Sequence, residues 1–135
     1  SALPARSEMC IRDRNEPTHG DFHEGQIHVW NGHVCGILDV DTVGPGRRAD
    51  DLACLVAHLS TVQRMNVPQA DRMRQILTAW VPVFDSRVDP IELRLRSAAV
   101  AISLATGPYR SQEDNWQAET LSIVDAAEAL VNQVA

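Results

Sequence analysis

Apolar residues recur at helical spacing over most of the chain beyond residue 48. Between residues 48 and 62 they stand three, four or seven positions apart, which predicts an amphipathic helix with Leu52, Leu55, Val56, Leu59 and Val62 on one face. The same spacing predicts a second helix from about residue 69 to 81, ending at Pro82, and a fourth from residue 111 to the C-terminus. A third helix is predicted from residue 90 to 106, because Asp89 is a good N-cap and Pro90 suits the first helical position.

Two short apolar runs earlier in the chain predict a β-hairpin. Residues 27–30 and 34–38 flank Asn31 and Gly32, a pair that readily adopts the positive φ of a tight turn. The first run alternates and the second is nearly continuously apolar, so both predict burial. The glycines on either side of Pro45 are expected to break the chain. The predicted fold class is therefore α+β and mainly α-helical, with a β-hairpin flanked by about four helices.

The apolar fraction, the net charge and the cysteine spacing limit the kinds of protein that this chain can be. Of the 135 residues, 44% are apolar and the net charge is −6, which is typical of a globular domain and argues against nucleic acid as a partner. No apolar run is long enough to span a membrane, and no signal peptide is visible. The three cysteines show no CxxC spacing, which favours a reduced, cytoplasmic setting.

Polar residues border the hairpin at both ends. Asp21 and Gln26 stand in the segment that enters it, while Asp39 and Asp41 follow it, so folding the hairpin brings Asp21, Gln26 and Asp39 toward one end. One carboxylate to handle a proton and two oxygen donors for a hard cation are what phosphoryl transfer requires. Asp39 and Asp41 point the same way in an extended segment and repel unless a cation compensates them; the alternative is that Asp41 serves a turn.

The same residues carry a resemblance to a known family. Residues 19–55 resemble the C-terminal lobe of the aminoglycoside phosphotransferase and choline kinase family, which is distantly similar to protein kinases. Its catalytic loop, H-G-D-x-x-x-x-N, stands here as His19-Gly20-Asp21 with Gln26 in place of Asn. Its metal segment, I-D followed by glycine and D-L-A, stands here as Leu38-Asp39, then Gly44, then Asp51-Leu52-Ala53.

The resemblance implies roles for individual residues. Asp21 would be the catalytic base, Asp39 a Mg²⁺ ligand and Gln26 the second metal ligand, with one more methylene than the family's Asn. His19, Asp41 and Asp51 would support the loop. ATP would be the co-substrate, and a hydroxyl of an aminoglycoside, choline or a similar small molecule would accept the phosphate.

One absence suggests that the chain is only part of such an enzyme. All 12 basic residues are arginine, whereas a kinase-like fold needs a strand lysine and a glycine-rich loop in its N-terminal lobe. Residues 15–135 are therefore expected to be a C-terminal lobe without its N-terminal lobe, and inactive alone. Residues 1–14 show no periodicity and are expected to be a disordered or non-native leader. Within them, Met9 to Asp13 matches the translation of a transposon adapter, which indicates adapter read-through.

Two other functions remain open. A catalytically inactive kinase-like binding module fits the absent lobe and the Gln26 substitution. A small zinc protein is suggested by five residues close in sequence, although none forms a tight ligand pair: His19, His23, His28, His33 and Cys35. Acidic residues after Val81 suit either a cationic substrate or a solvated face: Asp85, Asp89, Glu113 and Asp114.

Overall fold

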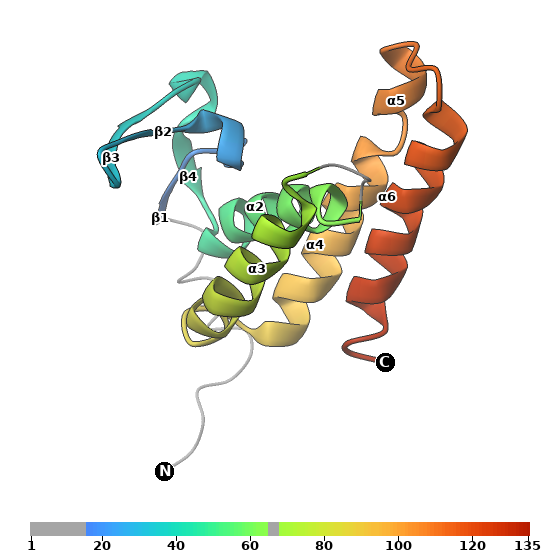
Figure 1. Cartoon of the computed structure of the whole chain (residues 1–135). Coiled ribbons are helices and arrows are strands. Elements are labelled where there is room, and N and C mark those ends of the chain that lie inside the picture. The colour runs from blue at the N-terminus through green and yellow to red at the C-terminus, as the bar shows by residue number, and fades with distance from the viewer. Residues whose placement is uncertain (1–15, 65–67) are drawn as a thin grey trace.

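The computed structural model describes residues 16–64 and 68–135, so the leader predicted for residues 1–14 lies outside it (Figure 1). The predicted α+β, mainly α-helical class is confirmed. Four helices of 15 or 16 residues make up most of the structure: α2 (Arg48–Val62), α3 (Ala70–Asp85), α4 (Pro90–Leu104) and α6 (Trp116–Val131). The remaining elements are short: β1 (Glu16–Thr18), β2 (Ile27–Trp30), β3 (His33–Ile37), β4 (Gly44–Gly46) and α5 (Gly107–Arg110).

The hydrophobic core forms where α2, α3, α4 and α6 pack together, and α2 contacts each of the other three helices (Figure 1). Leu55, Val56 and Leu59 of the predicted stripe are buried there. Leu93 of α4 is completely buried, and burial of a leucine contributes about 1.5–3 kcal/mol. Alanines make up much of the rest of the core, which lets the helices approach closely: Ala53, Ala57, Ala98, Ala101 and Ala127.

The prediction that the second helix ends at Pro82 is wrong, because α3 continues through Pro82 to Asp85. A proline inside a helix removes one backbone donor and clashes with the preceding turn, at a cost of about 3 kcal/mol. Val81 and Phe84 lie on either side of Pro82, and both pack against the core. Their burial offsets the cost of the proline.

The start of α4 follows the sequence prediction and its end does not. The Asp89 side chain accepts a 2.8 Å hydrogen bond from the backbone N–H of Glu92, as an N-cap does. The helix ends at Leu104, after which the short α5 intervenes, and α6 begins at Trp116 instead of residue 111. Gln112 has a left-handed φ of 54°, which prevents one helix from running through this region.

Two separate two-stranded sheets precede the helices. The predicted hairpin is confirmed: β2 pairs with β3 antiparallel, and Asn31 and Gly32 have φ values of 49° and 77°. Residues 44–46, expected to break the chain, instead form β4, which pairs with β1 so that Pro17 lies opposite Pro45. The proline ring lacks a donor, and both strands are edges here, where proline is tolerated.

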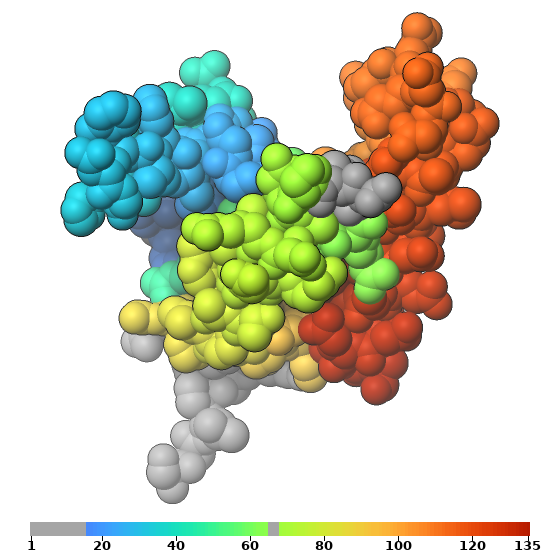
Figure 2. All heavy atoms as spheres, viewed as in Figure 1, coloured from blue at the N-terminus to red at the C-terminus, as the bar shows by residue number. Residues whose placement is uncertain are grey.

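The predicted burial of the hairpin is wrong. Trp30 is 70% exposed and Val34 64% exposed, and Figure 2 shows residues of the sheets projecting to the left of the helical body. Within the described part of the chain, the two strands pack mainly against each other. We name the exposed residues of this region the hairpin apolar surface: Val29, Trp30, Val34, Ile37, Leu38, Val40 and Val43.

Candidate functional site

The segment that carries Asp21 is held against the first turn of α2. The two carboxylate oxygens of Asp51 accept hydrogen bonds from the backbone N–H groups of His19, at 2.7 Å, and Gly20, at 2.9 Å. Gly20 has a φ of +89°, and a Cβ at this position would lie 2.8 Å from Oγ1 of Thr42. Both the left-handed backbone and the close approach therefore require glycine.

His19 links this loop to the end of the hairpin. Its side chain is buried, with Nε2 lying 2.8 Å from the carbonyl oxygen of Leu38 and Nδ1 accepting a hydrogen bond from the backbone N–H of Asp21 at 3.3 Å. These contacts fit the neutral tautomer that carries its proton on Nε2. The hydroxyl of Thr42 also donates to the His19 carbonyl at 2.7 Å. His19 thus aligns residue 21 with residue 38.

The Asp21 side chain is half exposed and contacts two residues. The Cys54 thiol lies 3.7 Å from Oδ1 of Asp21, and Nε2 of His23 lies 3.9 Å from Oδ2. Burial, together with the negative charge of Asp21, raises the pKa of Cys54 to about 12. The thiol therefore keeps its proton at neutral pH and can donate it to the carboxylate.

Gln26 and Asp39 come together as the sequence predicts. The side-chain nitrogen of Gln26 lies 3.3 Å from Oδ2 of Asp39, and the Leu38 N–H donates to the Gln26 carbonyl at 2.8 Å. Rotating the Gln26 side-chain amide by half a turn exchanges the positions of its nitrogen and oxygen. Oε1 of Gln26 then lies beside the Asp39 carboxylate. An amide oxygen and a carboxylate oxygen on one side of the loop form a donor set that fits Mg²⁺.

The extended geometry expected for Asp39 and Asp41 is wrong. Asp39 has a left-handed φ of 52°, and Val40–Thr42 form a 3₁₀ turn. This turn lets Thr42 reach the His19 carbonyl. Asp41 is exposed on the turn, so its position fits the alternative of a turn residue.

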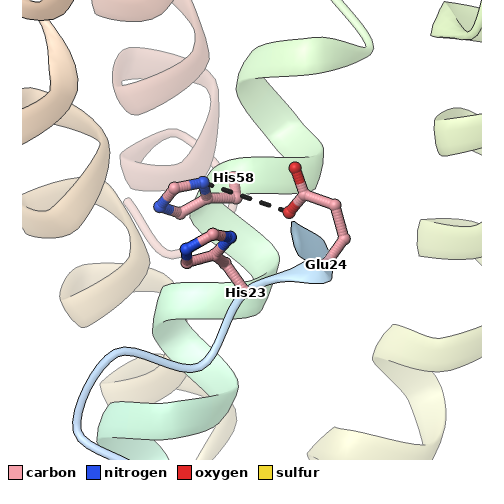
Figure 3. Close-up of side chains that lie close together, drawn as sticks. All are labelled: His23, Glu24 and His58. Atoms are coloured by element: carbon pink, nitrogen blue, oxygen red, sulfur yellow. Dashed lines mark ion pairs between the residues drawn. The ribbon is translucent and has the colours of Figure 1, made fainter. Parts of the chain in front are cut away.

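His58 is a member of this region that the sequence analysis missed. Its ring stacks on that of His23, with centroids 4.4 Å apart and planes 8° from parallel, and its Nδ1 lies 4.0 Å from Oε2 of Glu24 (Figure 3). Burial lowers the pKa of His58, against the opposing effect of the Glu24 carboxylate. Asp51, Cys54 and His58 stand three and four positions apart on α2 and so share one face, a polar stripe that could have identified His58.

The histidine cluster suggested by the sequence does not assemble. His28, His33 and Cys35 lie exposed on the hairpin, and His19 is buried against Leu38. Across residues 16–64 and 68–135, the one group of three potential metal ligands close enough to share an ion is His23, Glu24 and His58. Only His23 belongs to the predicted set.

Two of the acidic residues expected to suit a cationic substrate already have partners. Asp85 forms a two-bond ion pair with Arg94, and Asp89 caps α4. Glu113 and Asp114 are exposed beside α5. A groove of about 300 Å³ lies between α2, α3 and α4, but Asp21, Gln26 and Asp39 do not line it. This groove therefore lies apart from the three candidate site residues.

Comparison with known protein families matches more than half of the chain. The sequence model of the family described as "Phosphotransferase enzyme family" matches residues 2–82, which include the loop around Asp21 and the segment from Asp39 to Asp51. No curated protein and no solved structure matches the chain. Among the described residues, every helix is too short or too polar to cross a membrane.

Proposed function

Because this chain belongs to the phosphotransferase enzyme family, we propose that it carries the catalytic loop and metal segment of an ATP-dependent enzyme that phosphorylates a hydroxyl group of a small molecule. The family match confirms the resemblance found in the sequence. The choice of ATP, of Mg²⁺ and of a small-molecule acceptor is our proposal.

The observation that supports it best is the arrangement of Asp21, Gln26 and Asp39. Gln26 and Asp39 approach within 3.3 Å across the base of the hairpin, and Asp21 stands at the start of the same loop. Asp51 fixes the backbone just before Asp21 through two hydrogen bonds. The proposed base and the two proposed metal ligands thus come from one loop and from the segment that follows the hairpin.

Each residue has a defined task in the proposed reaction. Asp21 accepts a hydrogen bond from the substrate hydroxyl and takes its proton as the oxygen attacks the γ-phosphorus, while the bond to the β-phosphate breaks and ADP leaves. Asp39 and the Gln26 amide oxygen hold Mg²⁺, which neutralises charge on the phosphates. The Cys54 thiol donates to Oδ1 of Asp21 and so leaves Oδ2 to face the substrate.

We further propose that the chain is the C-terminal lobe of a two-lobed enzyme in the cytoplasm. The absence of lysine leaves no residue of the kind that grips nucleotide phosphates in kinase-like folds. The hairpin apolar surface, with Trp30 70% exposed, is suited to lie against another lobe. Cys35 and Cys54 are free thiols, in keeping with a reduced compartment.

The test is transfer of labelled γ-phosphate from ATP to a panel of aminoglycosides, choline and related amino alcohols. It is run with residues Ser1–Ala135 and with residues 15–135 joined to their native upstream sequence. We expect Mg²⁺-dependent transfer by the longer protein and none by residues Ser1–Ala135. A longer protein that binds nucleotide without transferring phosphate would overturn the proposal in favour of an inactive binding module.

A further inference from the structure

His23, Glu24 and His58 form a cluster that the proposed phosphoryl transfer does not use. Two of the residues come from the loop after Asp21, and the third comes from the middle of α2 (Figure 3). One ligand atom from each lies within 4.8 Å of the others. The cluster therefore joins two segments that are 34 positions apart in the sequence, from residue 24 to residue 58.

The cluster is partly buried. The side chains of His23 and His58 are each only 22% exposed, and that of Glu24 is 41% exposed. The two imidazole rings lie face to face, and in this arrangement no hydrogen bond joins them. Nδ1 of His23 accepts a hydrogen bond from the backbone N–H of Gly25 at 3.2 Å, so Nε2 is the His23 nitrogen that is left to bind an ion.

The donor set determines which ion would fit. Two imidazole nitrogens and one carboxylate oxygen are ligands that Zn²⁺ and similar divalent transition metals prefer, and sites with three protein ligands keep a position for water. Mg²⁺ prefers oxygen ligands alone, which is what Gln26 and Asp39 offer. The two clusters are therefore chemically distinct although they share one loop.

We propose that His23, Glu24 and His58 bind one Zn²⁺ ion and thereby tie the loop that carries Asp21 to α2. In a tetrahedral site with bonds of about 2.0 Å, neighbouring ligand atoms lie about 3.3 Å apart. The three ligand atoms lie within 4.8 Å of one another, so the side chains must close by up to about 1.5 Å. One ring must also turn out of the parallel stack, because each nitrogen directs its lone pair in its own ring plane. The χ2 torsion of histidine is broad, which permits the turn.

An ion at this site would also restrain the loop that carries Asp21, because His23 lies close to two residues of that loop. Nε2 of His23 lies 3.9 Å from Oδ2 of Asp21 and 3.2 Å from the side-chain nitrogen of Gln26. A metal ion that holds His23 against α2 fixes the segment between Asp21 and Gln26. The ion acts as a clamp on the loop, and its binding does not depend on whether the chain transfers phosphate.

The experiment is a calorimetric titration of chelator-treated protein, residues Ser1–Ala135, with Zn²⁺. Cys10 and Cys35 are replaced by Ser so that these thiols do not compete for the metal. We expect saturation at one equivalent and an affinity that falls more than about tenfold in His58→Ala, since loss of even an indirect support of a ligand costs 10–100-fold. The matched controls are His28→Ala and His33→Ala, which remove exposed histidines of the hairpin and should leave the affinity unchanged.

Two further measurements distinguish the loss of metal binding from the loss of folding. Circular dichroism in chelator checks that each variant is folded, and Glu24→Ala replaces His58→Ala if the latter is not. Co²⁺ in place of Zn²⁺ should give visible absorption that is lost in the same variants. Absence of saturable binding, or binding that the hairpin controls weaken as much as His58→Ala and Glu24→Ala do, would overturn the proposal.

Discussion

The Asp51 carboxylate accepts a 2.7 Å hydrogen bond from the backbone N–H of His19, which stands 32 positions earlier in the chain. Its second oxygen accepts from Gly20 at 2.9 Å. Asp51 lies in the first turn of α2, where the helix dipole favours a negative charge. One side chain therefore connects the most buried helix to the backbone just before Asp21.

Replacing Asp51 should destabilise the protein. Asp51→Ala leaves the N–H groups of His19 and Gly20 without their acceptor, at an expected cost of about 1–3 kcal/mol in the free energy of unfolding. The control is Asp71→Ala, in the first turn of α3, where the carboxylate contacts only exposed Arg74 and the expected change is within about 0.5 kcal/mol. Urea unfolding followed by circular dichroism measures both, and equal losses would contradict the assigned role of Asp51.

Asp21→Asn should remove catalysis while leaving the fold intact. In the active enzyme we expect kcat to fall by about 10²–10⁴, the range for loss of a general base. The Asp21 side chain is 53% exposed, so the thermal unfolding midpoint should change little. Asp125→Asn, an exposed change on α6, serves as the control. Undiminished turnover in the Asp21→Asn enzyme would rule out Asp21 as the base.

The Gln26 side chain should set the metal requirement of the reaction. Gln26→Asn keeps an amide oxygen and restores the family motif, so activity should persist. Gln26→Ala removes one of the two proposed ligands, so the Mg²⁺ concentration for half-maximal activity should rise, and chelation with EDTA should abolish activity in all forms. Identical Mg²⁺ dependence of Gln26→Ala and the parent enzyme would show that Gln26 is no ligand.

Cys54 should make stability depend on pH in the alkaline range. Its pKa rises from 9.0 to about 12 on folding, so above pH 9 the unfolded chain loses a proton that the folded protein keeps. The folded state then binds more protons, and the free energy of unfolding falls as pH rises from about 9 to 12. Cys54→Ala should flatten this decline, whereas Cys35→Ala, at an exposed thiol, should not. Urea unfolding at several pH values tests this, and an unchanged slope in Cys54→Ala would count against it.

Gly20→Ala and Gly32→Ala separate backbone strain from steric clash. Both glycines have a positive φ, which costs an alanine roughly 1–2 kcal/mol. A Cβ at Gly32 meets nothing within 4 Å, whereas at Gly20 it lies 2.8 Å from Oγ1 of Thr42. Gly20→Ala should therefore lower the free energy of unfolding by more than Gly32→Ala. The Gly20 contact would be refuted by equal effects of the two substitutions in thermal unfolding.

Much of the helical structure follows from the sequence because its causes are local. The apolar spacing of α2, the Asp89 cap of α4 and the Asn31-Gly32 turn each depend on hydrogen bonds and packing within a few residues. The hairpin likewise predicted that Gln26 and Asp39 lie together, since they stand at its two ends. These features can therefore be predicted from short stretches of sequence.

Other features were decided only by contacts between distant segments. The continuation of α3 through Pro82 depends on the core that receives Phe84, and the pairing of β1 with β4 joins residues 26 to 30 positions apart. The apolar sequence of the hairpin predicts burial. The hairpin is nevertheless exposed, because no other part of the described chain covers it. Apolar spacing shows which side chains favour burial, but only the tertiary structure determines what covers them.

The residues of the candidate site also differ in whether the sequence could predict them. Asp21, Gln26 and Asp39 stand in a recognisable sequence order, but His58 has no motif and is brought to His23 by the docking of the loop on α2. That docking depends on the Asp51 hydrogen bonds and on the buried face of α2, both of which join segments more than 30 positions apart. The order of Asp21, Gln26 and Asp39 follows from the sequence, whereas contacts between distant segments determined which residues of α2 face their loop.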